Sequence, residues 1–390
     1  MKSAHLICFM LLIVLLALPG FAHAEPEEPD ISVEDAVEKW LDELGLSQWQ
    51  SAADTIENDY DLFRLTDLME WIRRYALTGE APAGEITQQW FLSAVRRELD
   101  RCAGLFFSLL GISILSGVAK TIGGQGKHSA AEAAGFACRC FTLAVVLSVF
   151  AGLTKACTEA IRALSRFMQI ALPALLTVLT AMGGTASAGV IQPATTFLCG
   201  GMTTAMQGIV VPVALCGGIL GVINCLGSGD RLGGMVTLAK KSVKWTVGIA
   251  TSLYLGITSI RGLSAATYDG ISVRTAKYAA SNLVPFVGGF VSGTMDTLLG
   301  CAGLVKNAAG LASVMIGASI VFAPLLRIFL YMAMFRVSIA LTQPVSETPQ
   351  IRMQTEACEM LSCYIAAMIA TTLMFFVTTA LITSIGGAAG

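Results

Sequence analysis

The chain has 390 residues, of which 55% are hydrophobic and 13% are charged, and its formal net charge is −2. This composition is too apolar for most water-soluble enzymes and too weakly basic for a nucleic-acid-binding protein. The charge is unevenly distributed, because residues 25–100 carry 19 acidic and 6 basic residues whereas residues 101–390 carry 8 acidic and 18 basic ones. We therefore expect a short acidic segment in water and a long apolar segment in a bilayer.

The N-terminus has the pattern of a secretory signal. A basic start at Lys2 precedes an apolar run at Leu6–Leu18, and Ala22-His23-Ala24 offers a small-residue cleavage site. We expect cleavage after Ala24, which defines a signal peptide at residues 1–24. The alternative is an uncleaved first membrane helix, although the run is shorter than the roughly 20 residues of a full span.

The segment at residues 25–100 is expected to form a small acidic helical domain outside the cytoplasm. Its apolar residues recur at helical spacing in three stretches. Its acidity argues against binding to nucleic acid or anionic lipid, because both attract basic groups. The acidic face either contacts a protein partner or is only solvated.

The segment at residues 101–390 is expected to form an all-α polytopic bundle of about eight to ten transmembrane spans. Eight candidate spans are Cys102–Ala119, Ala134–Leu153, Leu164–Met182, Val243–Leu263, Val284–Leu304, Ala308–Leu326, Ile328–Leu341 and Leu361–Ile385. Another apolar run, Pro193–Leu226, would be about 50 Å long as one helix, well beyond a hydrocarbon core of about 30 Å. We interpret it as a hairpin or as two spans that break near Val211-Pro212.

Patterns for catalysis, metal binding and disulfides are missing from the sequence. The exported segment has no cysteine, and most of the others lie in apolar runs, where cysteine acts as a small hydrophobe. Signal cleavage would leave His128 as the single histidine, which excludes histidine triads and histidine-based zinc sites. P-loop, nucleophile-elbow and Rossmann motifs are also absent. We therefore predict no enzyme activity, no cofactor and no metal.

Two features of the apolar part are candidates for function. Gly217 and Gly221, and likewise Gly289 and Gly293, have the G-x-x-x-G spacing that lets helix backbones approach closely, either within the bundle or between molecules. Asp296 lies in an apolar run with no base within a helical turn. It either pairs with a base or lines an aqueous route, or it is a carboxylate near a bend that loop water solvates.

The stretch at residues 268–345 combines apolar runs with a distinctive set of polar residues. Its segments include Tyr268-Asp269-Gly270-Ile271-Ser272-Val273-Arg274-Thr275-Ala276-Lys277-Tyr278, Met295-Asp296-Thr297-Leu298-Leu299-Gly300-Cys301, Leu304-Val305-Lys306-Asn307-Ala308-Ala309-Gly310, Ala323-Pro324-Leu325-Leu326-Arg327 and Gln343-Pro344-Val345. These segments strongly resemble the stage III sporulation protein AE family of endospore-forming Firmicutes. Candidate functional polar residues at the family's spacing are Asp269, Arg274, Lys277, Asp296, Lys306 and Asn307.

The resemblance implies a location and a role. The chain would be a multi-pass protein of the mother-cell membrane around the forespore, within an assembly proposed to be a channel or secretion-like apparatus joining the two compartments. Its partners would be the lipid bilayer, ring-forming subunits and a secretion-type ATPase, and not nucleic acid. It would serve as a membrane platform or gate component needed for late forespore development and gene expression.

A second hypothesis is a secondary transporter of a small solute or ion, with Asp296, Lys306 and Asn307 near the path. Uptake by the reconstituted protein alone, abolished by Asp296→Asn, would favour the transporter. Co-purification with ring and ATPase subunits would favour the channel subunit.

Overall fold

The computed structural model describes residues 85–123, 128–182, 184–227, 231–283, 288–344 and 348–385. Within these ranges the regular elements are all helical: α5 (Glu85–Gly123), α6 (His128–Ala181), α7 (Thr185–Ala205), the π-helical turn η1 (Met206–Val210), α8 (Val211–Asn224), α9 (Gly233–Leu283), α10 (Gly288–Thr342) and α11 (Thr348–Ser384). The predicted all-α fold is confirmed for this part of the chain. The predicted signal peptide and most of the predicted acidic domain lie outside it.

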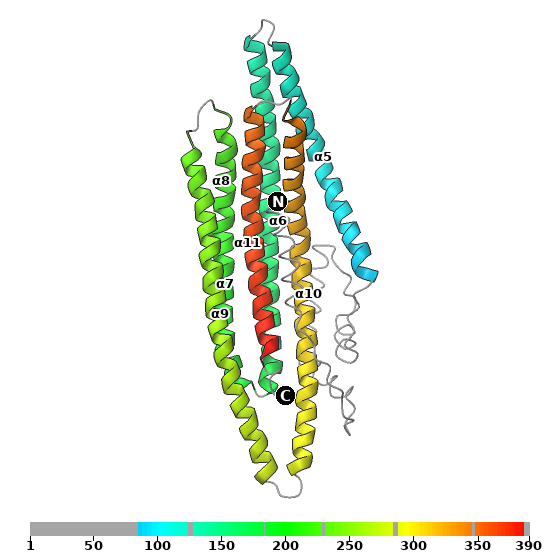
Figure 1. Ribbon diagram of the computed structural model, residues 1–390, viewed down its shortest axis with the longest axis vertical. Helices are drawn as coiled ribbons and strands as arrows, with labels where there is room; N and C mark the ends of the chain where they lie inside the picture. Colours follow the sequence, from blue (N-terminus) through cyan, green and yellow to red (C-terminus); the bar gives the residue numbers. More distant parts are fainter. Residues whose placement is uncertain are drawn as a thin grey trace.

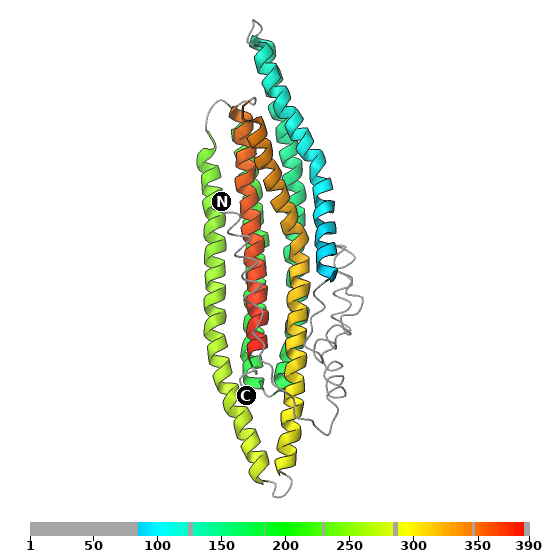
Figure 2. The same cartoon turned by 45° about the vertical axis from the view of Figure 1, so that its right-hand side comes forward.

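The helices form an elongated bundle in which successive long elements run in opposite directions (Figure 1; Figure 2). Helices α7 and α8 continue each other through η1 and act as one element. Helix α11 contacts α6, α8, α9 and α10, and most of its residues are buried along its whole length. The core of the bundle therefore surrounds α11, and the hairpin of α9 and α10 extends past the lower end of the other helices in both views.

Several helices are much longer than a bilayer is thick. Helix α6 has 54 residues and α10 has 55, which corresponds to about 80 Å each at a rise of 1.5 Å per residue. Five stretches in the described ranges are long and apolar enough to cross a membrane: Val95–Val118, Glu132–Ala181, Ile191–Asn224, Gly300–Thr342 and Thr348–Ser384. The chain is thus a multi-pass membrane protein, although a core of about 30 Å covers only part of each long helix.

The prediction of eight to ten separate spans is wrong, because predicted neighbours merge into continuous helices. Helix α6 contains both spans predicted between residues 134 and 182, and α10 contains all or most of the three predicted between residues 284 and 341. The charges at Lys155, Glu159, Arg162 and Arg166 do not end a span. Their spacing places them on one exposed side of α6, so the opposite side stays apolar and the helix continues.

The predicted break near Val211-Pro212 is also wrong. The chain passes from α7 to α8 through the π-helical turn Met206–Val210, with Pro212 in the first turn of α8. A proline lacks an N–H and its ring collides with the carbonyl four residues earlier, here Gly208. The wider π-turn relieves this collision without ending the helix.

Large apolar side chains are exposed on the outside of the bundle. Phe107 is 70% exposed, Phe197 is 80% exposed and Trp245 is 68% exposed. Such a surface is unfavourable in water, but it is the expected surface of helices that face lipid tails. Because these surroundings are apolar, a buried polar contact between two helices indicates a specific pairing of their side chains.

Candidate functional site

Charged side chains from four helices form two groups of ion pairs between helices, which together we call the charged layer. One part joins α5 to α10 and the other joins α9 to α11. The residues of the charged layer are Glu98, Arg101, Lys240, Arg327, Glu356 and Glu359.

The first part of the charged layer is built on Glu98 of α5. Arg327 of α10 donates two hydrogen bonds to this carboxylate, from Nε to Oε2 at 2.8 Å and from Nη2 to Oε1 at 2.7 Å. Arg101, one turn along α5, donates a third bond at 3.0 Å. The Glu98 side chain is only 6% exposed. This fork-to-fork geometry is the strong form of an ion pair, and it fixes α5 against α10.

The second part of the charged layer is built on Lys240 of α9. Its Nζ lies 2.7 Å from Oε2 of Glu356 and 2.7 Å from Oε2 of Glu359, both on α11. Burial disfavours the charged amine, but the two carboxylates outweigh burial and raise the Lys240 pKa above its usual range. Lys240 therefore stays protonated and holds α9 against the central helix.

The two parts lie at nearly the same height in the bundle. The Cys358 thiol of α11 lies 3.8 Å from the backbone carbonyl of Met332 on α10, which aligns these two helices. Arg327 is five residues from Met332, or about 7.5 Å along the axis, and both glutamates are within about 3 Å of Cys358. Arg327 and Glu356 lie on opposite sides of this level, so the charged layer spans about 10.5 Å, or about two helical turns.

Glycines of α8 leave space for the side chains of α9 and α11 at the charged layer. A Cβ atom on Gly221 would lie 3.0 Å from Oε2 of Glu356, and one on Gly217 would lie 2.8 Å from both the Ala239 Cβ and the Met360 Cε. Both predicted helix-packing glycines of this pair therefore face α9 and α11 inside the bundle. The surroundings of the other pair, Gly289 and Gly293, are outside the described part.

Lys306 lies at the lower end of the bundle. Its side chain is 1% exposed, and its Nζ donates to the backbone carbonyl of Ile385, just beyond the end of α11. A lysine in this position caps a helix C-terminus, where unpaired carbonyls and the helix dipole favour a cation. Asn307, its neighbour, is half-buried.

The other four candidates, Asp269, Arg274, Lys277 and Asp296, lie on the hairpin of α9 and α10, and their side chains are outside the described part. Their backbone positions still give a register. The hairpin joins Leu283 to Gly288, so Asp296, eight residues into α10, is level with Arg274 and Lys277, nine and six residues before the end of α9. If Asp296 pairs with a base, Arg274 and Lys277 are therefore the two candidates at its height along the hairpin.

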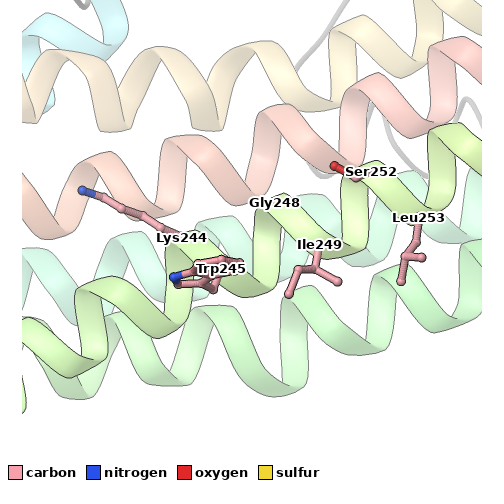
Figure 3. Close-up of a pocket in the computed structure, with 6 residues that line it drawn as sticks. All are labelled: Lys244, Trp245, Gly248, Ile249, Ser252 and Leu253. Atoms are coloured by element: carbon pink, nitrogen blue, oxygen red, sulfur yellow. The ribbon is translucent and has the colours of Figure 1, made fainter.

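A shallow depression of about 540 Å³ lies on the outer side of α9 (Figure 3). The indole of Trp245 and the side chains of Ile249 and Leu253 lie one turn apart on the same side of the helix. The depression has few polar groups, and within the described ranges no cluster of histidine, cysteine or acidic side chains is arranged to hold a metal. The geometry of the described residues supports helix packing and lipid contact.

Sequence reasoning missed most of the charged layer. Glu98 falls within the predicted acidic segment at residues 25–100, and neither Glu356 nor Glu359 is among the candidate residues. A signal existed, since Glu356 and Glu359 are three residues apart and so share a face of a helix. Their partner Lys240 is 116 residues away from Glu356, and no sequence period connects the two.

The sequence was compared with families and proteins that are already known. The family model described as "Stage III sporulation protein AE (spore_III_AE)" matches residues 55–386. A curated protein named "Stage III sporulation protein AE" from Bacillus subtilis (strain 168) is 28% identical over 229 residues, which is 59% of this chain and 57% of that protein. The match thus spans less than two thirds of that relative. No solved structure matches the chain.

Proposed function

Because this chain belongs to the stage III sporulation protein AE family, we propose that it is an integral membrane subunit of a channel or secretion-like complex that connects mother cell and forespore. It acts as a platform or gate component in the mother-cell membrane around the forespore. Its partners in that complex are ring-forming subunits and a secretion-type ATPase.

The observation that carries this proposal is the family match, which extends over residues 55–386 and so includes the whole helical bundle. The bundle adds physical support. Its interior is filled by side chains from α6, α10 and α11, and its buried charges are used in contacts between helices. A chain of this kind works by holding a shape in the membrane and by contacting other subunits.

The first test is a clean deletion of the gene in the native host, followed by fluorescence microscopy through sporulation. We expect engulfment to be completed, after which the forespores shrink and late forespore gene expression fails. A wild-type copy restores sporulation. Normal spores from the deletion strain would refute the proposal.

A second test identifies the partners. The tagged chain is purified from sporulating membranes in mild detergent, and the bound proteins are identified by mass spectrometry. We expect ring-forming proteins and a secretion-type ATPase in amounts comparable to the chain. Solute uptake by the chain alone in proteoliposomes, together with purification free of such partners, would replace the proposed role by that of a transporter.

A further inference from the structure

Uncharged polar side chains form a second buried group in the upper half of the bundle, which we call the amide–hydroxyl cluster. It is contributed by α5, α6, α10 and α11, and each member is at most 2% exposed. Its members are Ser113, Ser116, Thr142, Ser338, Thr342, Gln350 and Gln354. Burial of polar groups among apolar helices is unfavourable unless each finds a hydrogen-bond partner.

Two hydrogen bonds place three of these helices in register. Gln354 of α11 donates through Nε2 to the Ser113 hydroxyl of α5 at 3.2 Å, and Gln350 donates through Nε2 to the Thr142 hydroxyl of α6. Helices α5 and α11 run in opposite directions. Ser116, about 4.5 Å beyond Ser113, is therefore at the height of Gln350.

The fourth helix joins at the same height. The contact between Cys358 and Met332 aligns α11 with α10. Ser338 is six residues from Met332 towards the loop that joins these helices, which places it level with position 352. Ser338 therefore lies between the heights of Gln350 and Gln354, so α10 carries its part of the cluster at the same level as α11.

Some polar atoms of the cluster have no hydrogen-bond partner among the described residues. Thr142 donates to the Cys138 carbonyl, and Thr342 donates to the Ser338 carbonyl. Four buried atoms of the cluster have no partner among the described residues: Oε1 of Gln350, Oε1 of Gln354, Oγ of Ser116 and Oγ of Ser338. These are two acceptors and two hydroxyls, which is the complement of a water molecule that donates two hydrogen bonds and accepts two.

The charges nearby favour water over a cation. Arg139 lies one turn above Thr142 on α6, with a buried Nε, and its positive charge disfavours a second cation at this height. On α11, Glu356 is two residues from Gln354, hence on the opposite side of the helix, and it is bound to Lys240. The cluster thus has no described carboxylate of its own to neutralise a bound cation.

We propose that the amide–hydroxyl cluster is a water-binding site that bridges α5, α10 and α11 inside the bundle. Bound water completes the hydrogen bonds of the two glutamines and the two serines. The site makes this level of the bundle hydrated, whereas the core further along α11 includes apolar contacts such as that between Phe167 and Phe375. This inference does not depend on the proposed membership of a channel complex.

The sign of a stability change tests the site. In a dry core, Ser116→Ala and Ser338→Ala each remove an unpaired polar atom and raise the melting temperature of the full chain. With bound water they remove a hydrogen bond, and each lowers the melting temperature by about 2–4 °C. Ser313→Ala is the matched control, since Ser313 is also fully buried but donates to Ala309 on its own helix.

With bound water, both variants lower the melting temperature as Ser313→Ala does; an increase, or no change relative to the wild type, would overturn the proposal. Melting temperatures in sodium, potassium and choline chloride separate water from a monovalent cation. We expect the same value in all three salts, and a loss of stability in choline would overturn water in favour of a cation.

Radiolytic oxidation in native membranes gives a second measurement, because bound water generates hydroxyl radicals in place. Met353, on α11 between the two glutamines, is 0% exposed, and Met374, further along α11, is 2% exposed. We expect Met353 to be oxidised several times faster than Met374, and the Ser116→Ala/Ser338→Ala double variant to lose that difference. Equal oxidation of the two methionines in the wild-type chain would show a dry core and refute the site.

Discussion

The ion pair between Glu98 and Arg327 allows the sharpest prediction. The pair is bidentate, and the side chains of Glu98 and Arg327 are 6% and 28% exposed. Removing one partner of a buried pair costs about 3–5 kcal/mol, because the other charge is left uncompensated. The partial exposure of Arg327 places the expected cost of Glu98→Leu near the lower end, at about 3 kcal/mol.

The double variant separates the interaction energy of the pair from the separate effect of each substitution. With Glu98→Leu and Arg327→Leu combined, no buried charge of the pair is left unpaired, so we expect a stability within about 1 kcal/mol of wild type. With a cost of about 3 kcal/mol for each single variant and at most about 1 kcal/mol for the double variant, the coupling energy between the two positions is about 5 kcal/mol. Arg101, which is 59% exposed, contributes little to this value because water screens its charge.

The assay is the free energy of unfolding in detergent for the wild type, both single variants and the double variant. The control cycle uses Lys155 and Glu159, a surface pair at 3.8 Å whose side chains are 78% and 48% exposed. We expect a control coupling of no more than about 0.5 kcal/mol. Additive effects at Glu98 and Arg327, or equal couplings in the two cycles, would refute the role of the charged layer in fixing α5 against α10.

Three further substitutions have definite expected outcomes. Gly217→Ala forces α8 away from α9 and α11 and should lower the melting temperature by several degrees, whereas Gly208→Ala, with open space around it, should change it little. Lys306→Met should leave the level of protein in membranes unchanged, because the loss of the hydrogen bond to the Ile385 carbonyl is offset by the removal of a buried charge. A sporulation defect at that unchanged level would assign Lys306 a role in function. A collapse of the protein level would contradict this reasoning. Asp296→Lys should abolish sporulation, and Lys277→Asp in the same chain should restore it if the register of the α9–α10 hairpin pairs the two; failure of the rescue would show that they do not pair.

Much of the architecture follows from local sequence. The apolar runs predict membrane helices because no other element satisfies its own backbone hydrogen bonds in lipid. The continuity of α6 was also available in principle, since Lys155, Glu159, Arg162 and Arg166 recur at helical spacing. The prediction instead ends one span at Leu153 and begins the next at Leu164, because it takes the charges between them as a break in the apolar run and not as one side of a helix.

Pro212 is a second place where a local sequence rule does not give the correct structure. Pro212 predicts a break, because in a regular α-helix its ring collides with an earlier carbonyl. The structure resolves the collision with the five-residue turn Met206–Val210, which keeps the helix continuous. The local rule identifies the strained position, but it does not specify the π-helical turn that relieves the strain.

The sequence alone therefore determined the helical class, the membrane-spanning character of the long apolar part and, through the family match, the link to sporulation. Only the tertiary structure decided which polar residues meet. Lys240 finds Glu356, Glu98 finds Arg327, and Ser113 finds Gln354 across separations of 116, 229 and 241 residues. Helical periodicity assigns each residue to a face of its own helix, but the partner depends on which helices pack together and at what height, and these are set by the packing of the whole bundle.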